Sequence, residues 1–168
     1  LIKYHGHFCG GLVEASVSLT VALGKLYPNG VIDRTDTRVV SNNSPCGGDV
    51  ASYLTGGRLR FGTHFIDKTL KEGEFIVQQI SRKKTIRVRI NPEIYPHDVR
   101  MKMKQIESGN YTKEDLREFQ ELQWGYGIKL ISHSPFELFF AGEIENYSFP
   151  KHPLPELGVR HDNDYKNE

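Results

Sequence analysis

Apolar residues run from Leu12 to Leu26 with few polar interruptions, and the turn-forming residues 28–30 end the run. This pattern is typical of a largely buried helix. A short strand is expected over residues 37–41, and a second, shorter helix over residues 49–54, which a glycine pair at 56–57 ends. The first third of the chain therefore predicts two helices with a strand between them.

Three further strands are expected over residues 58–66, 74–80 and 84–90. Within the last of them, β-branched residues alternate with Arg87 and Arg89. Because successive side chains of a strand point to opposite faces, one face of this sheet should be apolar and the other cationic.

The C-terminal half predicts more helix and a final strand. Helices are expected over residues 98–107 and from a Thr112 N-cap toward Ile131, and Pro135 ends the second of them. Residues 136–145 have strand character. This order predicts an α+β fold, in which an antiparallel-rich sheet packs with the N-terminal buried helix and is followed by a helical segment and a C-terminal strand and arm.

Three regions follow from the order of elements. Residues 1–92 are expected to form an α+β core that carries the candidate site. Residues 93–149 would form the helical segment and the final strand, packed on the core or across a dimer. Residues 150–168 contain three prolines and end in polar residues, so they predict an extended tail of low order.

The net charge of +1 conceals an uneven distribution. Residues 58–104 carry twelve Lys/Arg and five Asp/Glu, whereas residues 105–168 carry six and twelve. A polybasic nucleic-acid arm is rarely followed by so acidic a segment, and the basic run at residues 82–84 has no interleaved aromatic residues, so nucleic acid is not an expected partner. No apolar run approaches the roughly 20 residues of a membrane span, and no secretory signal is visible. The sequence therefore predicts a soluble, cytoplasmic protein without a membrane partner.

The two cysteines, Cys9 and Cys46, limit the possible cofactors. One chain cannot supply the four thiolates of an iron–sulfur cluster or of an all-cysteine zinc ribbon. A mixed His/Cys site remains open, because the chain also has seven histidines. A disulfide between the two cysteines is an alternative, which the lack of a secretory signal argues against.

Each cysteine is followed by two glycines and precedes an expected helix start, where unpaired N–H groups and the helix dipole favour a thiolate. His5 and His7 precede Cys9 at intervals of two, so in an extended stretch all three side chains would face one side. Zinc accepts such mixed nitrogen and sulfur donors. We therefore expect a transition-metal site, most readily for zinc, formed by His5, His7, Cys9 and Cys46, with His64 as an additional candidate ligand.

Two alternatives stay open at this point. Cys9 could be a nucleophile that His7 and the helix dipole activate, in an enzyme whose Arg58 and Arg60 bind a small anionic substrate. The protein could also be a non-catalytic, homodimeric interaction subunit, with the cysteines as small buried apolar residues. Whether the protein is an enzyme is undecided by these patterns.

Three motifs carry a family resemblance: Y-H-G-H-F-C-G-G at residues 4–11, C-G-G-D-V at residues 46–50 and L-T-G-G at residues 54–57. In order and spacing they are similar to the F-H-G-H-x-C-P-G, C-x-x-D-A and L-T-G-C signatures of the FmdE family, which is named after a component of formylmethanofuran dehydrogenase. The resemblance covers most of the chain. It implies an α+β core, a groove lined by His5, His7, Cys9 and Cys46, often with a bound transition metal such as zinc, and a homodimer.

The chain also departs from that family pattern. Gly10 stands where the family usually has proline, Gly57 where a third cysteine is common, and residues 60–63 lack the usual lysine of a G-K-G-N stretch. No cysteine follows Cys46, so the C-terminal zinc finger of some relatives is absent from this sequence. Because the resemblance assigns the redox chemistry of the dehydrogenase complex to other subunits, formylmethanofuran oxidation is not inferred.

Overall fold

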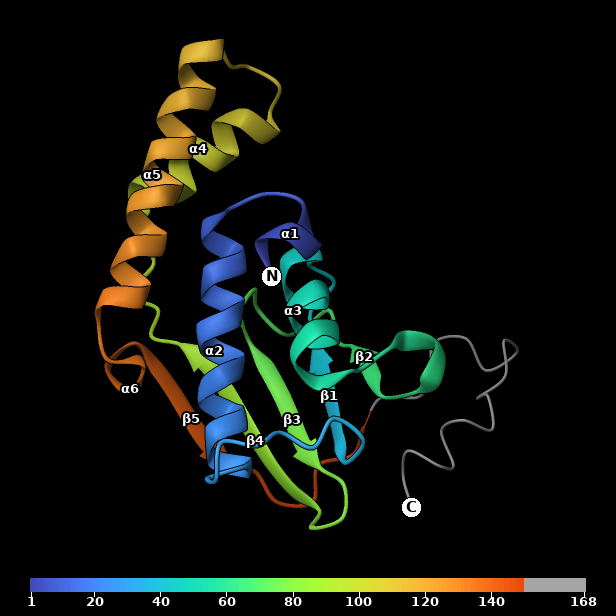
Figure 1. The fold of residues 1–168 in the computed structure, drawn as a ribbon. Coiled ribbons are helices and arrows are strands. Elements are labelled where there is room, and N and C mark those ends of the chain that lie inside the picture. The colour runs from blue at the N-terminus through green and yellow to red at the C-terminus, as the bar shows by residue number, and fades with distance from the viewer. Residues whose placement is uncertain (150–168) are drawn as a thin grey trace.

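The computed structural model describes residues 1–149 and confirms an α+β fold (Figure 1). The predicted tail, residues 150–168, lies outside the described residues. In chain order the elements are α1 (Ile2–His5), α2 (Gly10–Leu26), β1 (Thr37–Ser41), α3 (Pro45–Thr55), the 3₁₀-helix η1 (Leu59–Phe61), β2 (His64–Ile66), β3 (Phe75–Gln79), β4 (Lys84–Ile90), α4 (His97–Glu107), α5 (Lys113–Ser132), α6 (Pro135–Leu138) and β5 (Phe139–Glu143).

The five strands form one sheet in the order β2-β1-β3-β4-β5. Only the β1–β2 pair is parallel, which agrees with the predicted antiparallel-rich sheet. Helices α2 and α3 lie against one face of it (Figure 1). Burial of Leu19 and Leu23 of α2 with Val77 and Val88 of the sheet forms the centre of the main core.

Several elements follow their local sequence closely. β1 and β4 have the predicted bounds, and α5 begins at the predicted Thr112 cap, whose side chain accepts a hydrogen bond from the Asp115 amide in a reciprocal capping box. α5 also continues through two internal glycines. One of them, Gly127, has a packing reason, because a Cβ there would lie 2.7 Å from Cζ of Phe8.

Three predicted elements were wrong in part. The expected strand over residues 58–66 shortens to β2, because residues 59–61 turn into η1 and Gly62 follows with a positive φ of 63°. α3 starts four residues earlier than expected, since Ser44 caps it and Pro45 occupies its first position. The final strand begins only at Phe139, after the single turn α6.

The second half of the described chain packs on the first. β5 pairs with β4, and α5 lies beside α2. On the other face of the sheet, a smaller apolar cluster of Val40, Phe65, Leu70 and Ile76 is covered by residues 144–149. Among residues 1–149, none of the helices combines the length and apolar character that crossing a membrane requires.

Candidate metal centre

Three short segments bring His5, Cys9 and Cys46 together. His5 is the last residue of α1, Cys9 is the N-cap of α2, and Cys46 is the second residue of α3. The expectation of an extended stretch was wrong at His5, because residues 2–5 form a helical turn and Gly6 reverses the chain with a φ of 95°. Both cysteines are free thiols.

The donor atoms of these three side chains form a triangle. The two sulfurs, Cys9 Sγ and Cys46 Sγ, are 3.4 Å apart, and His5 Nε2 lies 3.8 Å from the first and 3.7 Å from the second. In a tetrahedral site with Zn–S distances of about 2.3 Å and Zn–N distances of about 2.0 Å, two sulfurs lie roughly 3.8 Å apart and a sulfur and a nitrogen roughly 3.5 Å apart, so each observed distance is within about 0.4 Å of the tetrahedral value. The spacing and chemistry of the three donors therefore fit one transition-metal ion.

Close packing of α3 on the start of α2 produces this spacing. A Cβ at Gly11 would lie 3.2 Å from Cys46 Sγ, so the sulfur rests directly on the glycine backbone. At the other thiol, Cys9 Sγ accepts a hydrogen bond of 3.3 Å from the Leu12 amide. The first turn of α2 thus holds one sulfur and makes room for the other.

The pKa values of the two thiols are shifted in opposite directions. A hydrogen bond from Cys46, the Leu12 amide and His5 together lower the pKa of Cys9 to about 5, against an opposing effect of burial. The pKa of Cys46 is raised, first by its hydrogen bond to Cys9 and then by burial. We therefore assign the thiolate to Cys9 in the metal-free protein.

Asp49 orients the imidazole of His5. Its Oδ2 lies 2.7 Å from His5 Nδ1, which raises the pKa of His5 and leaves Nε2 directed at the two sulfurs. Such a carboxylate behind an imidazole is a common feature of metal sites. The sequence carries one signal for this role, because Asp49 stands three residues after Cys46, on the same helical face.

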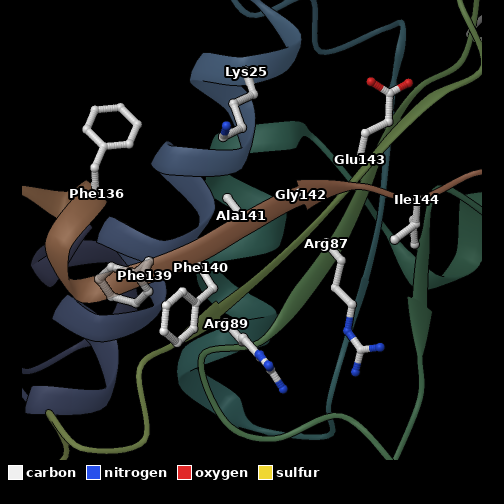
Figure 2. A pocket seen from close by; sticks show the side chains of 10 residues that line it. All are labelled: Lys25, Arg87, Arg89, Phe136, Phe139, Phe140, Ala141, Gly142, Glu143 and Ile144. Atoms are coloured by element: carbon white, nitrogen blue, oxygen red, sulfur yellow. The ribbon is translucent and has the colours of Figure 1, made fainter.

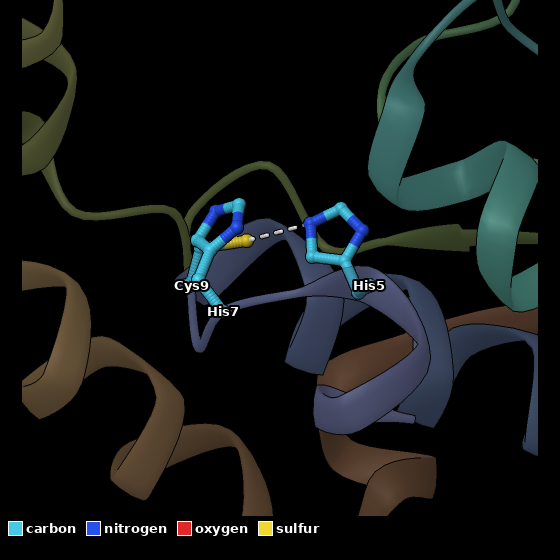
Figure 3. A group of neighbouring side chains, drawn as sticks. All are labelled: His5, His7 and Cys9. Atoms are coloured by element: carbon cyan, nitrogen blue, oxygen red, sulfur yellow. Dashed lines mark hydrogen bonds between the residues drawn. The ribbon is translucent and has the colours of Figure 1, made fainter.

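The other candidate residues lie in different surroundings. His7 is exposed, and its ligand atom lies within 4.8 Å of those of His5 and Cys9 (Figure 3). His64, by contrast, is buried in β2, where its Nε2 lies 2.8 Å from Ser41 Oγ, and burial lowers its pKa to about 4. Arg58 and Arg60 are exposed around η1 and line neither of the described cavities that include Cys9.

A cavity of about 110 Å³, here called the inner cavity, adjoins both thiols. Its walls include Glu14, Glu72 and the aromatic rings of Tyr95 and Tyr126, and no lysine or arginine. On its other side Cys9 borders a second cavity, of about 370 Å³, lined also by His7, Phe8 and residues of α5. The inner cavity is thus lined by carboxyl groups, which favours cations over anions.

The arginines of the sheet line a separate cavity. Arg87 and Arg89 border a space of about 620 Å³ around β5, together with Lys25, Phe136 and Phe140 (Figure 2). This cavity shares no lining residue with the inner cavity. The cationic face predicted from the alternation in β4 exists, but it is not part of the thiol site.

Comparison with protein family models assigns the chain to a family. The family model described as FmdE, molybdenum formylmethanofuran dehydrogenase operon, matches residues 4–140. The chain belongs to the FmdE family. The match confirms the resemblance carried by the three motifs, and the His/Cys group of this FmdE protein has the donors to hold a metal ion. A comparison with curated proteins gives no match.

Proposed function

We propose that this FmdE protein binds one zinc ion through His5, Cys9 and Cys46, with His7 as the fourth donor, and that it has an accessory or metal-handling role. The observation that carries the proposal is the triangle of donors 3.4 to 3.8 Å apart, backed by Asp49. The description of the family supports an accessory role associated with formylmethanofuran dehydrogenase.

The residues of the chain have distinct tasks in this proposal. Asp49 keeps the His5 ring in one orientation, and the Leu12 amide holds the Cys9 sulfur in its charged form. Because His7 is exposed, its position is the one that a small ligand would exchange most easily. Zinc held there would act as a Lewis acid toward such a ligand, or join α1 to the starts of α2 and α3.

Elemental analysis and zinc titration of untagged protein test this proposal. We expect one zinc per chain, and a loss of binding in Cys9→Ala and in His5→Ala. His133→Ala is the matched control, because His133 is an exposed histidine whose Nδ1 contacts only the Lys129 carbonyl among the described hydrogen bonds. Absence of zinc from the wild type, or equal zinc content in the Cys9→Ala variant, would refute the proposal.

A cysteine-dependent enzyme is the second candidate, and the low pKa of Cys9, about 5, favours it. A thiolate at neutral pH is a ready nucleophile. Labelling of the metal-free protein with iodoacetamide across pH tests this candidate, since Cys9 should react fully well below pH 7. A thiol that titrates near the free value of about 8.5 would remove it.

A second copy of the chain and a cytoplasmic location complete the proposal. β5 is an edge strand, and two large apolar side chains that line the cavity around it, Phe136 and Phe140, are exposed. Sedimentation should give a dimer that Phe140→Glu shifts toward monomer, and a wild type that stays monomeric would contradict this.

The two free thiols fit a reducing compartment.

A further inference from the structure

Glu14 is a buried acid at the edge of the thiol site. It is the fifth residue of α2 and is only 3% exposed. Its Oε2 accepts a hydrogen bond of 2.6 Å from the Tyr126 hydroxyl. Among residues 1–149 no ion pair involves it. A carboxyl buried without a cation favours its neutral form, because ionisation in an apolar setting is costly.

The Glu14 side chain lines two neighbouring spaces. It lines the inner cavity with Cys9 and Cys46, and it also lines an open groove of about 350 Å³, here called the outer groove. The two spaces share Glu72, Tyr95 and Met103, so they adjoin. The outer groove therefore connects the carboxyl with solvent.

The groups that face Glu14 come from several elements. Glu72 and Tyr95 lie in loops, Tyr126 belongs to α5, and the outer groove is rimmed by the cations Lys71, Arg100 and Lys104. Burial raises the pKa of Glu14 to about 7, the hydrogen bond from Tyr126 opposes this, and the charge of Glu72 adds to it. Both forms of the carboxyl are thus accessible near neutral pH.

We propose that Glu14 is the proton-exchanging residue of the thiol site, releasing a proton through the outer groove when a cation binds to the two thiols that border the inner cavity, and that Tyr126 positions its carboxyl. This inference rests on the proposed metal binding and adds a residue that the family motifs do not contain. An incoming cation stabilises the carboxylate and displaces the proton to solvent. A neutral or anionic ligand instead leaves the proton in place, so that Glu14 donates a hydrogen bond to it.

Calorimetric titration with zinc tests the inference, because the heat measured in two buffers of different ionisation enthalpy counts the protons released per zinc. At pH 7 the wild type should release up to about half a proton more than Glu14→Gln, since a group with a pKa near 7 is then about half protonated. Near pH 9 the two counts should converge. Glu145→Gln, which alters an exposed carboxyl after β5, should match the wild type throughout.

Tyr126→Phe provides an independent variant. It removes the hydrogen bond that lowers the pKa of Glu14, so the extra proton release should persist to higher pH than in the wild type. This variant decides the question if Glu14→Gln does not fold, and an unchanged pH dependence in it overturns the inference.

The two proposals fail in different ways. If Glu14→Gln binds zinc and releases as many protons as the wild type at every pH, the role of Glu14 is overturned and metal binding stands. If the wild type shows no zinc binding, both proposals are overturned.

Discussion

The thiol site and the cationic surface of β4 are both visible as residue patterns in the sequence, but they lie on opposite faces of the sheet. The thiol site has its donors on α1, α2 and α3, on the side of the sheet that α2 and α3 cover. The cationic surface consists of alternate residues of one strand, Arg87 and Arg89, which are exposed while Ile86 and Val88 are buried.

This difference explains why the arginines of the sheet do not line the thiol site. The buried residues of β4 face α2, so the arginines between them must face away from it. Arg87 is in addition bound to the buried carboxylate of Glu74, at 2.6 Å. A sheet cannot direct both sets of side chains to one site, and the inner cavity is lined by Glu14 and Glu72 and by no lysine or arginine.

The largest expected effect is the loss of zinc affinity when a thiol donor is replaced, compared with a change in the helix cap beside it. Cys46→Ser should weaken zinc binding by more than the 10- to 100-fold typical of outer-shell changes, because a hydroxyl replaces a thiol donor. Ser44→Ala, which removes the α3 cap, should cost about 1 kcal/mol of stability yet retain zinc. Competition with a chromogenic chelator measures both variants, and equal losses would mean that α3 stability, not the thiol, controls binding.

A pH-dependent effect should distinguish the acidic inner cavity from the surface. Burial raises the pKa of Glu14 from 4.5 to about 7, so its contribution to folding is full below pH 4.5 and is lost as the pH rises through 7. The loss amounts to about 3 kcal/mol. Urea unfolding of metal-free Glu14→Gln should therefore show a gain relative to wild type between pH 4.5 and 8. For the exposed Glu145→Gln variant we expect the free energy of unfolding to follow the same pH dependence as in the wild type. The same result for Glu14→Gln would contradict the burial effect.

Asp49→Asn should have the next largest effect. Loss of the carboxylate behind His5 should lower zinc affinity about 10- to 100-fold, because the imidazole loses its oriented partner. Asp98→Asn, at an exposed acid of α4, serves as control and should leave the affinity unchanged. A similar decrease in both variants would indicate a general charge effect.

The smallest expected effect is on the cationic surface itself. Arg89→Gln should change zinc affinity less than about twofold, because Arg89 is exposed, lines a cavity that shares no residue with the inner cavity, and has its charge screened by salt. A larger change in the same titration would show that the two regions are coupled and do not act as separate sites.

Local patterns were reliable where one element's own residues decide its form. β1, β4 and the capped start of α5 depend on β-branched alternation or on a cap three residues away, and all three were predicted. Residues 58–61 show why such patterns can fail. They alternate as a strand does, but Gly62 turns the chain and the amides of Thr63 and His64 bond to the Arg58 carbonyl instead of a neighbouring strand.

Periodicity and motifs a few residues long were enough to establish the α+β class, the family and the small set of soft donors. Which of those donors meet depended on the tertiary structure. It joined His5 to Asp49 across 44 positions, bonded His64 to Ser41, and buried Glu14 beneath Tyr126, 112 positions away. Those contacts arise from the packing of α1 on α3, the pairing of β1 with β2 and the packing of α5 on α2, and no local pattern contains that information.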